Sequence, residues 1–280
     1  MSTGIDYNFN QNTHTLTGPG AALPVILGDR KIDSLLDVGC GPGTWLAAAE
    51  RYGITDLHGV DGIAATSEDF HAHTATFTQA DLTRPFSLGR KFDVALCTEV
   101  AEHLPRESVD ILIASLCAHA DLIAFSAAIP GQPGQHHVTC EWPAYWQGKF
   151  NQCGFVCEDT VRWKLWDASE IEPWYRQNFF LARRDPAEAG KEPRIAAVVH
   201  PAMFPMMVDR QVREAQSEAL GEGQRDARRQ MEQSWFGGEL PALQYAVLCL
   251  RAIRGKFRRF ASWVRQQASV NKAQLASSRL

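Results

Sequence analysis

The sequence predicts an α/β fold: a seven-stranded, mostly parallel, doubly wound sheet followed by a helical C-terminal extension. Three observations indicate this fold. Short apolar runs alternate with helical stretches from residue 31 to about residue 184, which is typical of parallel strands joined by crossover helices. A glycine-rich turn at residues 39–43 follows the first apolar run. A polar segment with two prolines, residues 185–193, separates this region from a charged C-terminal part.

Seven apolar runs are the strand candidates. In chain order they are residues 34–39, 56–62, 75–82, 91–97, 120–128, 155–163 and 178–184. The first five alternate with helical stretches, so we expect a parallel sheet with helices on both faces. The last two follow the last long helix without another crossover, and we therefore expect an antiparallel hairpin at one edge of the sheet.

Helices are predicted between the strands. The pattern of residues 44–53 predicts a helix that ends at Gly53, because glycine commonly closes helices. Residues 107–120, and the part of 141–155 that follows Pro143, also have helical patterns. The chain divides into an N-terminal lid or helical segment (1–30), a cofactor-binding domain (31–186) and a helical, basic C-terminal extension (187–280).

The composition is that of a globular protein, with 45% hydrophobic and 21% charged residues. The stretch MSTGIDYNFNQNT has neither a basic start nor an apolar run, so no signal peptide is predicted. No run approaches the roughly 18 apolar residues that suggest a membrane span. The seven cysteines are scattered and odd in number, which favours reduced thiols and a cytoplasmic location.

The charges are distributed unevenly along the chain. Residues 181–280 carry 17 Lys and Arg against 10 Asp and Glu, whereas residues 1–180 carry 11 against 22. An acidic domain joined to a basic tail predicts two separate tasks for the two parts.

The segment LLDVGCGPGTWL, residues 35–46, is the strongest functional signal. An apolar strand ends at Asp37 and leads through Gly39, Gly41 and Gly43 into a helix. Glycines allow a sharp turn and close approach of a ligand, and the helix N-terminus offers free N–H groups. Asp37 suits a cationic or amino-bearing ligand and would repel a pyrophosphate. Asp61 ends the next strand, where α/β folds bind ribose hydroxyls.

On these residues the chain resembles the class I S-adenosylmethionine-dependent methyltransferases over about residues 31–184. The resemblance implies that Asp61 holds the ribose diol and that Asp81, with the backbone of Leu82, contacts adenine. The implied cofactor-binding residues are Asp37, Gly39, Cys40, Gly41, Gly43, Asp61, Gly62, Asp81, Leu82, Thr98 and Glu99. A dinucleotide dehydrogenase is the competing interpretation, but it usually has a longer G-x-G-x-x-G motif and has no need of Asp37.

The stretch TEVAEHLP, residues 98–105, has three interpretations. Glu99 and Glu102 could open the following helix and favour its positive end, with His103 packed beneath the cofactor. His103, or a later histidine, could be the general base that deprotonates a hydroxyl acceptor. In the third interpretation Glu99, Glu102, His103 and His137 bind a divalent cation.

The metal interpretation rests on a second resemblance. Plant small-RNA 2′-O-methyltransferases have E-x-x-E-H after the fourth strand and a further histidine before Glu-Trp, as His136–His137 precede Glu141–Trp142 here. The resemblance implies Mg²⁺ or Mn²⁺ bound to vicinal hydroxyls. Sugars and catechols also carry such diols, so this interpretation does not require an RNA acceptor.

The segment IPGQPGQHHVTCEWPAYW, residues 129–146, is a predicted loop at the rim of the pocket. His136 and His137 are catalytic candidates, together with His103 and Glu99. The segment resembles H-H-V-N-E-x-W-P-x-Y-W of methyltransferases from polysaccharide and secondary-metabolite clusters, with Thr139 and Cys140 in place of Asn and Glu. The N-terminal stretch with Tyr7, His14 and GPGAALP is expected to fold over the site as a lid.

The basic stretch LCLRAIRGKFRRFASWVRQQ, residues 248–267, leaves three alternatives open. It could dock on the catalytic domain with a solvated basic face, lie at an anionic membrane surface, or contact nucleic acid. Residues 208–236 could form a short helical coil that supports a homo-oligomer.

The expected function is O-methylation of a hydroxyl on a sugar or lipid-linked glycan, such as a surface polysaccharide. The enzymatic alternatives are metal-dependent methylation of RNA ribose, which the acidic catalytic domain disfavours, and methylation of a phenol or other natural product. The non-enzymatic alternative is a cofactor-binding scaffold in a glycan assembly complex. Peripheral contact with the inner face of the membrane would suit a lipid-linked acceptor.

Overall fold

The computed structural model describes residues 15–63, 70–209, 211–212, 216–218 and 221. The chain divides into two compact units, Met1–Gln211 and Val212–Leu280, and the fold presented here is that of the first. Among the described residues no helix is long and apolar enough to cross a membrane. The basic stretch 248–267 and the predicted coil from residue 222 to 236 lie outside the described residues, so their roles stay predictions.

The first unit is built on a single seven-stranded sheet with the order β3-β2-β1-β4-β5-β7-β6. Strands β1 to β5 are parallel, and β7 pairs antiparallel with both β5 and β6. The predicted mostly parallel sheet with an antiparallel edge hairpin is therefore confirmed. The strands are β1 (Ser34–Val38), β2 (Asp56–Asp61), β3 (Thr76–Gln79), β4 (Val94–Thr98), β5 (Leu122–Ser126), β6 (Phe155–Glu158) and β7 (Phe180–Arg184).

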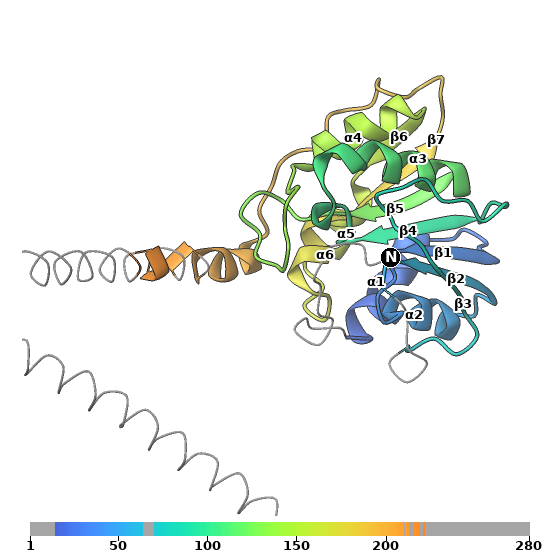
Figure 1. Cartoon of the computed structure of the whole chain (residues 1–280), viewed down its shortest axis with the longest axis horizontal. Coiled ribbons are helices and arrows are strands. Elements are labelled where there is room, and N and C mark those ends of the chain that lie inside the picture. Colours follow the sequence, from blue (N-terminus) through green and yellow to red (C-terminus); the bar gives the residue numbers. More distant parts are fainter. Residues whose placement is uncertain (1–14, 64–69, 210, 213–215, 219–220, 222–280) are drawn as a thin grey trace, which may run out of the picture. The chain divides into compact units, whose positions relative to one another are not determined.

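Helices cover both faces of the sheet (Figure 1). They are α1 (Thr17–Leu27), α2 (Thr44–Tyr52), α3 (Val109–His119), α4 (Pro143–Gln152), α5 (Thr160–Leu165) and α6 (Pro173–Asn178). Alternate residues of a strand point to opposite faces. Leu36 and Val38 of β1 accordingly pack with α3 and α4, while Leu35 packs with α1, α2 and α5. Helix α2 ends at Gly53, as predicted, with this residue in the left-handed conformation.

The predicted strand 155–163 is wrong in its second half. Strand β6 ends at Glu158, and residues from Thr160 onward form α5. Val161 and Leu165 are both buried, and their four-residue spacing places them on one helical face. An ion pair between Arg162 and Asp159 further supports this turn of helix.

The helix-opening interpretation of Glu99 and Glu102 is also wrong. A single 3-10 turn, Ala101–His103, follows β4, and α3 begins only at Val109. Pro105 disfavours the helical conformation at the residue before it, and Leu104 is extended. The two glutamates are therefore free to serve the site instead of the helix terminus.

The N-terminal segment is a packed helix over its described part. Ala22, Leu23, Ile26 and Leu27 of α1 are buried in the core cluster that includes α2 and α5. This apolar face fixes α1 against the sheet, and no residue of α1 lines the cavity described below. GPGAALP therefore lies within α1 and does not form a lid. Tyr7 and His14 lie outside the described residues.

The segment after β7 differs from the predicted helical extension. Residues 185–200 contain turns and irregular backbone, and the first helical turn is η4 (Pro201–Met203). Glu192 anchors this segment to the sheet. Its carboxylate accepts hydrogen bonds from Asn151 Nδ2 at 2.6 Å and from the backbone N–H of Cys157, on edge strand β6, at 3.0 Å. Glu192 therefore satisfies a backbone donor on an edge strand, which would otherwise be open to pairing.

We predict that Glu192→Gln lowers the free energy of unfolding by about 1–2 kcal/mol at pH 7, because a charged acceptor of several hydrogen bonds is lost. Burial alone would raise the pKa of Glu192, but the hydrogen bonds from Asn151 and its neighbours lower it to about 2. The stabilisation is therefore complete above the ordinary pKa of about 4.5 and is lost as the pH falls toward 2.

Chemical denaturation of both proteins between pH 3 and pH 7 measures this difference. The control is Glu188→Gln, which removes only an exposed ion pair with Lys191 and should change stability by less than about 0.5 kcal/mol. An effect of Glu192→Gln that does not vary with pH would contradict the assignment.

Candidate functional site

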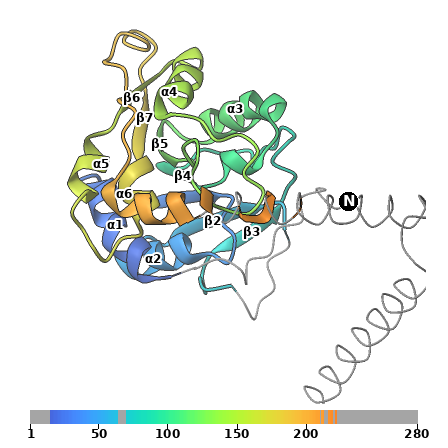
Figure 2. The ribbon, with the colours of Figure 1, turned by 90° about the vertical axis from the view of Figure 1, so that its left-hand side faces the viewer.

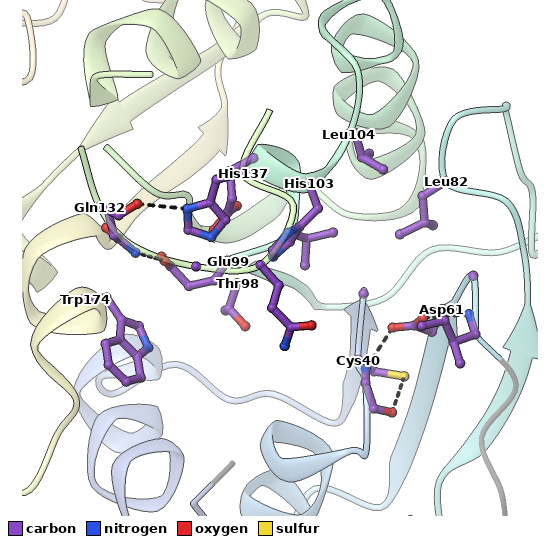
Figure 3. A pocket seen from close by; sticks show the side chains of 18 of the residues that line it. Cys40, Asp61, Leu82, Thr98, Glu99, His103, Leu104, Gln132, His137 and Trp174 are labelled. Atoms are coloured by element: carbon purple, nitrogen blue, oxygen red, sulfur yellow. Dashed lines mark hydrogen bonds between the residues drawn. The ribbon is translucent and has the colours of Figure 1, made fainter. Parts of the chain in front are cut away.

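A cavity of about 350 Å³ lies at the carboxyl ends of β1, β2 and β4. Strand β1 is the point at which the strand order reverses, and the crevice at such a point is the usual ligand site of open α/β sheets. In Figure 3 Cys40 and Asp61 lie across the cavity from His103 and His137. Trp174 and Leu82 lie toward opposite ends of it.

The glycine loop forms the floor of the cavity. Gly39 has φ 77°, and a Cβ built on it would lie 2.3 Å from a methyl of Val100, so no other residue fits without displacing that side chain. The backbone N–H groups of Gly39 and Cys40 donate to the carbonyl oxygen of Val60 at 2.7 and 3.2 Å. These bonds hold the loop against the end of β2. The backbone of Gly39 and Gly41 therefore lines the cavity without a side chain in between.

Asp61 holds the loop from the end of β2. Its carboxylate accepts hydrogen bonds from the N–H of Gly41 at 2.9 Å and of Ile63 at 2.8 Å. Burial raises the pKa of Asp61, and these backbone bonds oppose the increase. Asp61 and the neighbouring Gly62 line the cavity. The loop residues and the acid predicted to bind ribose are thus part of one hydrogen-bonded unit.

Asp37 is buried beneath the loop with no hydrogen-bond partner for either carboxylate oxygen among the described residues. Burial, and next the charge of Asp61, raise the pKa of Asp37 to about 8. A buried carboxyl group without partners is costly. A cationic amino group nearby would stabilise its ionised form, so this site fits the ammonium-bearing part of S-adenosylmethionine.

Asp81 and Leu82 lie at the other end of the cavity. The Asp81 carboxylate accepts from the backbone N–H and the hydroxyl of Thr83 at 2.9 and 2.6 Å. The hydroxyl of Thr83 lowers the pKa of Asp81, against a smaller effect of burial. Leu82 is 7% exposed and lines the cavity. The pair therefore offers an acceptor and an apolar surface suited to an adenine ring.

Glu99 is held in an unusual conformation at the end of β4. It has φ 54°, a left-handed conformation that is uncommon outside glycine. Its carboxylate accepts from Gln132 Nε2 at 2.6 Å and Asn178 Nδ2 at 3.0 Å. Burial raises the pKa of Glu99, and these two amides oppose the increase. Thr98 and Glu99 both line the cavity, where the resemblance places the transferred methyl.

Glu102, His103 and His137 form a cluster that could hold a metal ion, with one ligand atom of each lying within 4.8 Å of the others. The carboxyl group of Glu102 is fully buried and lies within hydrogen-bonding reach of the Glu99 carboxyl group. Burial, and next the charge of Glu99, raise the pKa of Glu102 well above its ordinary value. A divalent cation would satisfy this carboxylate, so the cluster fits one. Glu99 is not part of the cluster, in contrast to the predicted set of four ligands.

The imidazoles of His103 and His137 lie with ring centroids 5.0 Å apart. Burial, and next the neighbouring His137, lower the pKa of His103 to about 4. His137 Nδ1 lies 3.1 Å from the carbonyl oxygen of Gln132, a geometry that suits an N–H donor at Nδ1. A Cβ on Gly134 would lie 2.0 Å from His137 Nε2. Gly134 is therefore needed for the loop to pass this ring.

Two backbone hydrogen bonds bring the histidines together. The N–H groups of Val138 and Thr139 donate to the carbonyl oxygen of Glu102 at 2.8 and 3.0 Å. The hydroxyl of Thr139 also donates to the carbonyl oxygen of Leu104 at 2.7 Å. Thr139 therefore has a structural role at the position where the resembled pattern has Asn.

The structure brings most of the predicted residues to the cavity, with three exceptions. Asp37 lies beneath the glycine loop, and Gly43 turns the chain into α2 with φ 77°. His136 is exposed, has φ 49° and does not line the cavity. It is therefore a weaker catalytic candidate than His137, its neighbour.

Sequence reasoning missed Gln132, Trp174, Tyr175 and two methionines that also line the cavity, Met203 and Met206. Gln132 and Trp174 carry no spacing that indicates a site, because they come together at the cavity only through the fold. The two methionines did have a signal in the sequence, which is the clustering of methionine residues. Three of the five methionines in the chain fall within residues 203–207, which is unusual for a surface helix.

Comparison with known proteins identifies the family. A family described as "Methyltransferase domain" matches residues 13–152, which is half of the chain. No curated protein sequence matches the chain.

Solved structures share the fold. The sugar N-methyltransferase KedS8 from Streptoalloteichus sp. has a TM-score of 0.50 and 17% identity, over 63% of this chain and 91% of that protein. DesVI from Streptomyces venezuelae has a TM-score of 0.46 and 19% identity, over 60% and 92%.

The seven-stranded sheet, the glycine loop with its buried acids and the family match agree with one another. The chain belongs to the methyltransferase-domain family and is a class I S-adenosylmethionine-dependent methyltransferase.

Proposed function

We propose that the protein transfers a methyl group from S-adenosylmethionine to a hydroxyl oxygen of a sugar or glycan. The observation that carries this proposal is the pair of neighbouring imidazoles, His103 and His137, across the cavity from the glycine loop. A hydroxyl acceptor must lose a proton as its oxygen attacks the methyl carbon. A neutral imidazole at the right place can accept that proton.

When bound, S-adenosylmethionine supplies a methyl group on a sulfonium, which is a good leaving group. The protein's own task is then to orient the two reactants and remove one proton. Asp61 and the glycine loop orient the cofactor. His103 is neutral at physiological pH because its pKa is lowered to about 4. If His137 Nδ1 donates to the carbonyl oxygen of Gln132, the basic lone pair of that ring is on Nε2. We assign the role of general base to these two imidazoles. His137 is the one that lies on the segment of residues 129–146.

The surroundings of the pair support a sugar acceptor. Gln132 lines the cavity with an amide held by Glu99 and Asn178, and Trp174 offers an aromatic face at the same end of the cavity. A sugar ring carries both hydroxyl groups and C–H faces, so it would contact both the amide of Gln132 and the indole of Trp174. KedS8 acts on a sugar according to its description, although as an N-methyltransferase, which leaves the acceptor atom to be tested. Attachment of the acceptor to a lipid carrier stays a prediction.

Metal-dependent methylation of an RNA ribose is the second candidate, because Glu102, His103 and His137 form a cation-sized cluster. Two imidazoles and one carboxylate favour Mn²⁺ over Mg²⁺, which prefers oxygen ligands. Such an ion would lower the pKa of a bound hydroxyl. The balance of 22 acidic against 11 basic residues in residues 1–180 argues against a nucleic-acid surface on this part of the chain.

The cofactor site is tested by comparing the two ends of β2. Asp61→Asn should weaken binding of S-adenosylhomocysteine about 10- to 100-fold, because charge-assisted hydrogen bonds to the loop and to the ribose are lost. Asp56→Asn removes an ion pair with Arg90 at the opposite end of the strand and should leave binding unchanged. Isothermal titration calorimetry on both variants measures this. Equal affinities of the two variants would contradict the assigned role of Asp61.

The acceptor and the base are tested by transfer of a labelled methyl group into lipid-linked glycan, RNA, protein and small-molecule fractions of a host extract. We expect label in the glycan fraction. His137→Asn should lower that turnover about 100-fold, as expected for a lost general base, while S-adenosylhomocysteine still binds. His136→Asn is the matched control, because asparagine tolerates the left-handed conformation of that residue and His136 does not line the cavity.

Label in RNA alone would contradict the sugar acceptor and favour the second candidate. Unchanged turnover of His137→Asn would remove the general base from this residue. Cofactor binding without label in any fraction would favour a scaffold.

The metal is tested by Mn²⁺ binding, followed by electron paramagnetic resonance. If the second candidate is correct, the wild-type protein binds Mn²⁺, Glu102→Gln does not, and EDTA abolishes turnover. Glu107→Gln, at an exposed site four residues from His103, should behave as the wild type. Turnover that is unaffected by both EDTA and Glu102→Gln would exclude the metal and leave proton transfer to the imidazoles alone.

A further inference from the structure

The segment that follows the sheet returns to the cavity. After β7 the chain passes Ile195, which is buried, and reaches His200, which is 5% exposed. In Figure 2 the following stretch, in orange, crosses in front of the sheet, and its first turn, η4, packs against α6. This segment lies beyond residues 13–152, which match the methyltransferase family.

His200 fixes the segment in place. Its backbone N–H donates to Gln177 Oε1 at 2.8 Å, and its Nδ1 accepts from the N–H of Ala202 at 3.1 Å. Nε2 therefore carries the proton and donates to the carbonyl oxygen of Trp166 at 2.8 Å. Its carbonyl oxygen also accepts from the N–H of Met203 at 2.8 Å. All four polar groups of this buried residue are therefore satisfied, which indicates that the segment is firmly packed here.

The same hydrogen-bond network extends from Gln177 to Glu99, which follows β4 and lines the cavity. Gln177 Nε2 donates to Asn178 Oδ1 at 2.9 Å, and Asn178 Nδ2 donates to Glu99 Oε1 at 3.0 Å. Gln177 is 0% and Asn178 2% exposed. The position of His200 is thus connected, through two buried amides, to the strained residue at the end of β4.

Met203 and Met206 bring an apolar surface to the cavity. Met203 is 0% and Met206 36% exposed, and both line it. Their neighbour Met207 lies against Gly131, where a Cβ would come within 3.0 Å of its methyl. Met207 therefore rests on the start of the loop that carries Gln132 and His137.

The cavity has both a polar and an apolar lining. Its polar lining includes Glu99, Gln132 and the imidazoles, and its apolar lining includes Met203, Met206 and the indole of Trp174. Methionine side chains are flexible and polarisable, so they adapt to apolar groups of varied shape. S-adenosylmethionine is accounted for by the glycine loop, Asp61 and Asp81, which leaves this apolar surface to the acceptor.

We propose that residues 200–207 form a wall of the acceptor site, and that Met203 and Met206 bind an apolar aglycone attached to the sugar that is methylated. The proposal rests on the proposed function, which supplies the sugar. It adds that the acceptor is amphiphilic: its hydroxyl meets His137, and its apolar part meets the methionines. Met203 and Met206 are then specificity-determining residues, and His200 is a positioning residue.

The test uses the full-length protein, saturated with S-adenosylhomocysteine and labelled with carbon-13 at the methionine methyl groups. The chain has only five methionines, so Met203→Leu and Met206→Leu assign the signals. Methyl β-glucoside, octyl β-glucoside and 1-octanol are titrated separately, each below the concentration at which it forms micelles or separates. We expect both octyl compounds to shift the signals of Met203 and Met206. Octyl β-glucoside should bind about tenfold or more tightly than methyl β-glucoside, because its methylenes leave water.

Variants locate the effect. Met206→Gln keeps the length of the side chain and should weaken binding of octyl β-glucoside about tenfold, since a polar amide replaces the thioether. Val208→Gln, at a 54% exposed residue that does not line the cavity, should leave the affinity unchanged.

Two outcomes separate this proposal from the proposed function. Two results would contradict the proposal that residues 200–207 form a wall of the acceptor site. One is that neither octyl compound shifts the signals of Met203 and Met206, and the other is that Val208→Gln weakens binding as much as Met206→Gln. If 1-octanol shifts both signals and Met206→Gln weakens its binding, but neither glucoside binds, the apolar wall is supported and the sugar acceptor is contradicted.

Discussion

The carbonyl oxygen of Glu102 joins the two halves of the site. It accepts the N–H groups of both Val138 and Thr139, and so fixes the loop after β5 to the turn after β4. His103 lies next to Glu102 in one segment, and His137 lies next to Val138 in the other. The hydroxyl of Thr139 reinforces this link by donating to the carbonyl oxygen of Leu104. The cluster of Glu102, His103 and His137 is thus held together by backbone pairing at residues 138 and 139, to which the Thr139 hydroxyl adds a side-chain hydrogen bond.

The parts of the site that the sequence predicts well are those set by short-range geometry. Gly39 could be recognised because a tight turn after a strand requires glycine. Asp61 could be recognised because an acid at the end of the next strand commonly binds ribose hydroxyls in α/β folds. The switch from strand to helix after Glu158 was harder, because Val161 and Leu165 fit either period until the ion pair of Arg162 with Asp159 is seen. Gln132, Asn178 and Met203 could not be predicted from spacing. They reach Glu99 or the cavity from distant parts of the chain, through contacts that exist only in the folded protein.

Buried acids are the main energetic cost of this site. Asp37, Glu99 and Glu102 all have raised pKa values because burial removes their carboxylates from water. Only Glu99 has strong local compensation, from Gln132 and Asn178. Asp37 has no hydrogen-bond partner among the described residues, and Glu102 lies beside the like-charged Glu99. A core built for stability alone would replace such groups with apolar residues. Glu102 lines the cavity and Asp37 lies beneath the glycine loop that forms part of it, which is the placement expected if a bound ligand supplies favourable interactions.

The two chemical proposals place the same demand on the histidines and opposite demands on Glu102. Proton transfer to an imidazole requires a neutral ring, and so does metal binding. The lowered pKa of His103 therefore suits both and cannot distinguish them. Glu102 can. With no cation present, burial and the charge of Glu99 favour the protonated form of Glu102, which then donates a hydrogen bond to Glu99. With a cation present, the same carboxyl group must ionise to become a ligand. The protonation state of Glu102, and not the identity of the histidines, is thus the physical variable that separates general-base catalysis from metal-assisted methyl transfer in this cavity.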